Sequence, residues 1–219
     1  MPKQSLSVPS FLWEDFFKES ITDSPEISRY QKMADQGRAI IERTQARIQA
    51  VAKSPTATKA QKRVQMAKIV RQGKAEFEQR MNAHTAEVAA EISELQQEIK
   101  KAINAASPSA AKETRDRLTA MKPNERTAWL RRLQQAGDWD SLSHVLQKNP
   151  AYLDIEPDEF EDFKRAYMHG KHPEEAQKLD MLQKVDQNLR KGFFAASEGF
   201  NTYKTHDETA ADAAEKALK

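Results

Sequence analysis

The stretch from about Thr58 to Ala105 constrains the fold most, because it contains no proline and only one glycine, Gly73. Residues suited to a helical seam, apolar except for one histidine, recur in it every three or four positions: Phe77, Met81, His84, Val88, Ile92, Leu95, Ile99 and Ala102. Such spacing is typical of a coiled coil, here with a phase adjustment at Val88–Ile92. A single helix over this stretch would be roughly 70 Å long, since each residue adds ~1.5 Å.

A second helix is predicted just before it, from Pro25 to about Ala52. Ser24 can cap this helix, and Pro25 suits its first position. An apolar stripe runs along it: Ile27, Tyr30, Met33, Ile40, Ile41, Ile48 and Val51. The link to the next helix is the short segment 54–58, in which Thr58 can serve as the cap. A link this short favours an antiparallel hairpin.

Shorter helices are predicted for the rest of the chain, because proline and glycine interrupt it repeatedly. Gly137 is a predicted left-handed cap, and the last helix, from Pro173, should end near Phe200. No run alternates with the period of a strand. We therefore predict an all-α protein, with a long antiparallel, coiled-coil-like helical hairpin plus a C-terminal bundle of short helices. The predicted segments are an N-terminal helix (1–24), the hairpin (25–105), the bundle (108–204) and a frayed tail (205–219).

The composition agrees with an elongated helical chain. Only 38% of residues are hydrophobic and 31% are charged, which suits long amphipathic helices better than one large core. The absence of cysteine excludes disulfides, cysteine zinc sites and a thiol nucleophile, and it fits a reducing compartment. No apolar run approaches the roughly 18 residues of a membrane span, and residues 1–20 lack the pattern of a signal peptide. We expect no membrane partner and a cytosolic or virion-enclosed location.

The N-terminal segment is unusually rich in large apolar side chains. Ser10 can cap a short helix there, and five such residues fall within seven positions: Phe11, Leu12, Trp13, Phe16 and Phe17. A segment of this kind is not stable alone in water. It either packs on the chain's own helices or acts as an anchor in the groove of a protein partner.

Charge is unevenly distributed, although the net charge is only +2. Residues 29–74 contain twelve Lys or Arg and two acids, a net of +10, whereas residues 75–99 contain one Arg and six Glu, a net of −5. The candidate binding residues cluster around the predicted turn of the hairpin: Arg43, Arg47, Lys53, Lys59, Lys62, Arg63, Lys68 and Arg71.

This basic cluster has two interpretations. It would attract the phosphate backbone of double-stranded DNA with an affinity that depends on salt. Aromatic residues are absent from residues 31–76, so stacking on single-stranded bases is not expected. Alternatively, the cluster is a solvated face of a long hairpin, or it meets an acidic protein.

The chain offers little for catalysis or metal binding. No glycine-rich phosphate loop, nucleophile elbow or Cys/His pair occurs. His169 and His172 flank a helix break and provide only two potential ligands, while His84 falls on the seam, where a polar notch is the simpler interpretation. The acidic run 154–162 lacks the pattern of a calcium loop and suits the positive end of a helix. We predict no enzymatic activity, metal, cofactor or small-molecule substrate.

A motif runs from about residue 124 to 185: a Glu-Arg helix, Gly-Asp, a Leu-rich helix, a Pro-Leu turn, and a helix that opens with Pro. It comprises Glu125, Arg126, Gly137, Asp138, Leu142, Val145, Leu146, Pro150, Leu153 and Pro173. This motif resembles uncharacterised helical proteins encoded near the head genes of tailed bacteriophages. The chain departs from them at Asp154-Ile155-Glu156, where they have Ser-Gly-Leu. The resemblance implies a phage context and no activity.

These features favour a non-enzymatic bacteriophage structural or assembly protein of the head, neck or DNA-associated interior. Its partners would be other virion proteins and further copies of itself, with the basic turn facing DNA or an acidic surface. In this interpretation the protein is found in the virion or the host cytoplasm. Two alternatives are a cytoplasmic DNA-binding protein and a transient scaffold or adaptor for capsid assembly.

Overall fold

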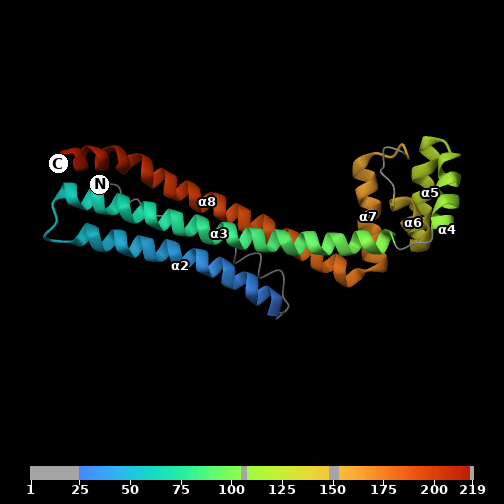
Figure 1. Cartoon of the computed structure of the whole chain (residues 1–219), viewed down its shortest axis with the longest axis horizontal. Helices are drawn as coiled ribbons and strands as arrows, with labels where there is room; N and C mark the ends of the chain where they lie inside the picture. The colour runs from blue at the N-terminus through green and yellow to red at the C-terminus, as the bar shows by residue number, and fades with distance from the viewer. Residues whose placement is uncertain (1–24, 105–107, 148–152, 218–219) are drawn as a thin grey trace. The chain divides into compact units, whose positions relative to one another are not determined.

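The computed structural model of the chain describes residues 25–104, 108–147 and 153–217, which form seven helices and no strand. The helices are α2 (Pro25–Lys53), α3 (Lys59–Asn104), α4 (Pro108–Thr119), α5 (Pro123–Ala136), α6 (Trp139–Leu146), α7 (Pro157–Lys171) and α8 (Pro173–Ala217). Five of them begin with proline, whose fixed φ and missing N–H suit the first helical position. The predicted all-α class and the long antiparallel pair, α2 and α3, are confirmed (Figure 1).

Local hydrogen bonds set the ends of several helices as the sequence predicts. Thr58 Oγ1 accepts from the Gln61 N–H at 3.2 Å, and Gln61 Oε1 accepts from the Thr58 N–H at 2.9 Å, so the two residues form a capping box at the start of α3. Gly137 ends α5 with φ of +68°, the predicted left-handed cap. Asp138 Oδ1 then accepts from the Ser141 N–H at 3.1 Å and caps α6.

The described residues divide into two compact units, and α3 and α8 contribute to both. Unit 1 consists of α2, residues 59–89 of α3 and residues 184–217 of α8. Unit 2 consists of residues 90–104 of α3, α4 to α7, and residues 173–183 of α8. This division differs from the predicted segments, which placed all of the last helix in the C-terminal bundle.

Unit 1 buries the apolar stripes of three helices against one another. The stripe predicted on α2 is buried at Tyr30, Met33, Ile40, Ile41 and Ile48. On α3, Phe77 stacks on Phe193 of α8 with ring centroids 5.9 Å apart, and it lies 5.8 Å from Phe200. Figure 1 shows α2 and α8 running along α3. These aromatic contacts explain why the C-terminal part of α8 belongs to unit 1.

The two helices of the hairpin lie close together where Gly73 of α3 faces Thr44 of α2. Thr44 is 3% exposed, and its Oγ1 donates to the carbonyl oxygen of Ile40 at 2.7 Å. A Cβ atom on Gly73 would lie 2.3 Å from this Oγ1. Only glycine at position 73 therefore allows the two helices to lie at this distance.

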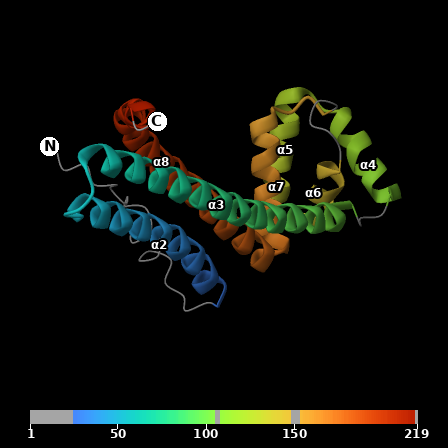
Figure 2. The ribbon, with the colours of Figure 1, turned by 60° about the vertical axis from the view of Figure 1, so that its left-hand side comes forward.

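Unit 2 is organised around α6, which contacts α4, α5 and α7 (Figure 2). Its buried core combines Leu142, Val145 and Leu146 of α6 with residues that include Leu118, Leu130, Phe160 and Phe163. The α3 seam joins this core at Ile103, which is buried, whereas the predicted seam residue Ala102 is half-buried. The seam shifts by one position because α3 meets different partner helices in this unit.

Of the two predictions for the ends of the chain, only the one for the C-terminal end can be compared with the structure. α8 continues to Ala217, so the predicted frayed tail is helical over residues 205–217. This part of the sequence is rich in alanine and contains no proline or glycine, which favours helix. The predicted N-terminal helix (1–24) lies outside the described residues.

Substitution of Gly73 by alanine tests the close approach of α2 and α3. Although alanine favours helix by about 1 kcal/mol over glycine, the added methyl group overlaps the buried Thr44, and overpacking typically costs about 1–3 kcal/mol. We expect Gly73→Ala to lower the free energy of unfolding in urea. Gly199→Ala on α8 is the matched control, because a Cβ there meets nothing within 4 Å, and it should raise stability by about 0.5–1 kcal/mol. Equal stabilisation by both variants would contradict the close packing.

Candidate functional site

The turn between α2 and α3 brings the predicted basic residues to one end of the hairpin. The Ser54 N–H donates to the carbonyl oxygen of Val51 at 3.2 Å, and Lys62 Nζ donates to that of Ala52 at 2.9 Å. These bonds and the Thr58 capping box place the end of α2 beside the start of α3. Six of the eight predicted residues are exposed and two, Lys62 and Arg63, are half-buried. The eight residues thus share one end of unit 1.

Two ion pairs between the helices involve basic residues that lie farther from the turn. Arg29 pairs with Glu87 and Arg43 with Glu76 across the hairpin. Nearer the turn, Arg47 donates instead to the uncharged Gln72 at 3.4 Å. The reason is that Glu76 is the first acidic residue of α3.

Around the turn itself the positive charge has no counterpart on the hairpin. Residues 44–73 contain seven Lys or Arg and no Asp or Glu. Lys53, Lys59 and Lys68 are exposed, and none of them pairs with an acidic residue in the described part of the chain. The end of the hairpin is therefore a concentrated cationic surface, which favours binding of a polyanion.

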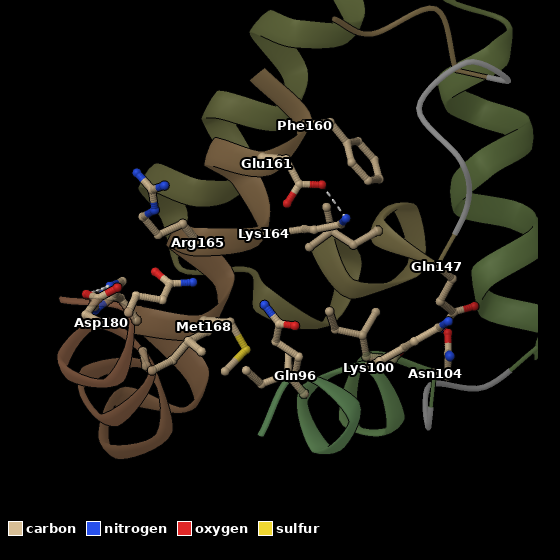
Figure 3. Close-up of a pocket in the computed structure, with 17 residues that line it drawn as sticks. Gln96, Lys100, Asn104, Gln147, Phe160, Glu161, Lys164, Arg165, Met168 and Asp180 are labelled. Carbon is tan, nitrogen blue, oxygen red and sulfur yellow. Dashed lines mark hydrogen bonds and ion pairs between the residues drawn. The ribbon is translucent and has the colours of Figure 1, made fainter. Parts of the chain in front are cut away.

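Unit 2 contains a groove of about 770 Å³ that the sequence did not indicate (Figure 3). α3, α6, α7 and α8 line it. Its apolar wall includes Leu146, Phe160 and Met168 from the buried core, together with the half-buried Ile99 and Leu179. Four helices far apart in the sequence form this groove, so no local pattern could have predicted it.

Charged side chains surround the apolar wall of the groove. Lys164 Nζ lies 2.5 Å from Glu161 Oε1 and 5.0 Å from the centroid of the Phe160 ring (Figure 3). His169 Nε2 lies 3.1 Å from Asp180 Oδ2. Lys100 on α3 is exposed and has no ion-pair partner among the described residues. The groove thus combines an apolar wall with an uncompensated cation.

The histidines and acids considered as ligands have separate contacts. His169 pairs with Asp180, whereas the His172 ring lies 5.9 Å from that of Tyr167. In the acidic run, Glu159 accepts from Arg131 at 2.8 Å and from Thr127 at 2.9 Å. No group of three His, Asp or Glu side chains suited to a metal ion occurs in the described ranges.

Several residues that carry the phage resemblance have structural roles in unit 2. Arg126 donates to the carbonyl oxygens of Leu153 at 2.8 Å, Met121 at 3.1 Å and Thr119 at 3.3 Å, and so ties the turn before α7 to the end of α4. Gly137 and Asp138 are helix caps, and Leu142, Val145 and Leu146 are buried. The motif therefore encodes packing rather than a reactive site.

Comparison of the chain with models of known protein families, with curated proteins and with solved structures finds no match in any of the three. No helix in the described part of the chain has the length and apolar character needed to cross a membrane. The proposals below therefore rest on the residues, the geometry and the resemblance described above.

Burial of His84, the polar residue of the seam, leads to a prediction of how acid changes the stability of the hairpin. It is 8% exposed, and its Nε2 lies 3.0 Å from Oε1 of Gln36 on α2. Burial, reinforced by the positive charge of Arg80 and partly opposed by Glu87, lowers the pKa of His84 below its ordinary value of 6.5. The unfolded state therefore binds more protons than the folded state at mildly acidic pH, and stability falls as the pH drops below about 6.5.

We expect urea unfolding of the wild-type chain to show this loss between pH 7.5 and 5.5. His84→Gln removes the titrating group, and the part of the loss that is due to His84 should disappear. An identical pH dependence in both proteins would show that His84 does not titrate differently on folding.

Proposed function

We propose that the chain is a non-enzymatic structural or assembly protein whose hairpin end binds the phosphate backbone of double-stranded DNA. The observation that carries this proposal is the absence of acidic residues from 44 to 73, against seven basic ones. Exposed lysines at and near the turn lack acidic partners among the described residues. Their charge is available to an external polyanion.

Two features favour a duplex backbone over other nucleic-acid sites. The basic residues lie on two adjoining helices and are spaced over several helical turns, which suits a row of phosphates better than one bound anion. Residues 31–76 contain no aromatic side chain on which single-stranded bases could stack. An acidic protein surface is the competing partner.

Neutralising the unpaired lysines tests the DNA contact. We expect Lys53→Gln, Lys59→Gln and Lys68→Gln, combined in the full chain, to weaken binding to a random-sequence duplex on the order of a few hundredfold near 0.1 M salt. The slope of log affinity against log salt should become less steep by about 3, because each lost phosphate contact removes about 0.9.

The control carries the same charge change at exposed lysines elsewhere: Lys112→Gln, Lys184→Gln and Lys191→Gln. It should keep most of the affinity and the steeper slope. If the two triple variants weaken DNA binding equally, the affinity depends on the net charge of the chain and not on the hairpin end. If the chain binds an acidic protein tightly and does not bind duplex DNA, the acidic protein replaces DNA as the proposed partner.

We further propose that this DNA contact serves the assembly of a tailed-phage particle, in its head, neck or DNA-associated interior. The resemblance over residues 124–185 supports that setting. Mass spectrometry of purified mature particles should detect the chain in multiple copies. Its presence only in immature particles would identify a transient scaffold, and its absence from both would point to a cytoplasmic DNA-binding protein.

A further inference from the structure

The groove of unit 2 has features of a peptide-binding surface that DNA binding does not use. Part of its wall consists of half-buried apolar side chains, Ile99 on α3 and Leu179 on α8. Gln96 and Lys100 of α3 lie across it from Glu161 and Lys164 of α7 (Figure 3). Its volume of about 770 Å³ lies within the roughly 300–1,000 Å³ of pockets that enclose a ligand.

We propose that this groove binds the Phe11–Phe17 segment of a second copy of the chain. That segment places five large apolar residues in seven positions. In the helix predicted for it, Leu12, Trp13, Phe16 and Phe17 share one side, because residues four apart lie one turn above each other. Glu14 and Asp15 flank that side.

The groove and the segment are complementary in chemistry. An amphipathic helix binds a groove by placing its apolar side against an apolar wall. The two acids beside the apolar side would then face the cations of the groove, Lys100 and Lys164. Lys164 is already paired with Glu161, so Lys100 is the stronger candidate to meet an acid of the incoming segment.

The choice of a second copy as the source rests on the proposed function, because an assembly protein acts in several copies. Segment and groove are different surfaces of one chain, so each copy would offer a free groove and a free segment to its neighbours. Contacts of this heterologous kind repeat from copy to copy until a ring closes or a filament grows. Self-association of the full chain would therefore extend beyond a dimer.

Charge reversal at the groove tests this contact in solution. We expect Lys100→Glu combined with Lys164→Glu to weaken self-association of the full chain at least tenfold in sedimentation analysis. Adding Glu14→Lys and Asp15→Lys to the same chain should restore it. The matched control, Lys112→Glu with Arg132→Glu, reverses two exposed charges of unit 2 outside the groove and should associate like the wild type.

Site-specific cross-linking provides a test that does not depend on charge. Because the chain has no cysteine, Glu14→Cys in one copy and Lys164→Cys in a differently tagged copy supply the only thiols. Oxidation of the mixture should yield a disulfide-linked pair of the two tags. With Lys112→Cys in place of Lys164→Cys, no disulfide-linked pair of the two tags should form.

Three results would overturn the inference. They are a full chain that stays monomeric, groove reversal that leaves association unchanged, and oxidation of the mixture that yields no disulfide between the two tags. Duplex binding measured on the same variants separates this inference from the proposed function. If the cross-link does not form but the chain binds DNA, only the groove contact is rejected. If the cross-link forms but the chain does not bind DNA, only the DNA contact is rejected.

Discussion

Burial of the apolar stripe along α3 is the interaction on which the other features depend. A helix of 46 residues with a largely polar surface gains most of its stability from packing that stripe against neighbours. In unit 1 the neighbours are α2, through Thr44 and Gly37, and α8, through Phe193 and Phe200. Gly73 allows the close approach on the first side, and the stacked aromatic rings cover the other.

Cross-helix ion pairing contributes to the register of the hairpin more than to its stability. The pairs Arg29–Glu87 and Arg43–Glu76 involve half-exposed side chains, and such surface pairs typically contribute about 0–1 kcal/mol. These pairs partly explain why the chain has a basic stretch (29–74) followed by an acidic stretch (75–99). The lysines around the turn are not accounted for in this way, since no acidic residue faces them on the hairpin. The hairpin's own ion pairs do not account for this cationic surface, which favours a role in binding.

The two proposed surfaces belong to different units and use different chemistry. The hairpin end offers exposed cations without aromatic or apolar surroundings, which suits an anion that remains hydrated. The groove offers a partly exposed apolar wall bordered by charged side chains, which suits an amphipathic segment. The substitutions that test one surface involve no residue of the other.

Local sequence patterns predicted most of the described helix starts, several of their caps and the hairpin. Proline at helix starts, Thr58 with Gln61, and Gly137 act through hydrogen bonds and backbone angles within a few residues, so their effect is visible in the local pattern. The seam spacing likewise predicted five buried residues of α3, which are Phe77, Met81, His84, Val88 and Leu95.

Which helices share a core depends on contacts between parts of the chain that are far apart in sequence. The extension of α8 along unit 1, the shift of the seam to Ile103, the contact of Gly73 with Thr44, and the groove all join residues that are distant in the chain. Apolar surface is buried against whichever neighbour fits it, and that choice depends on non-local packing. One sequence without its fold does not specify it.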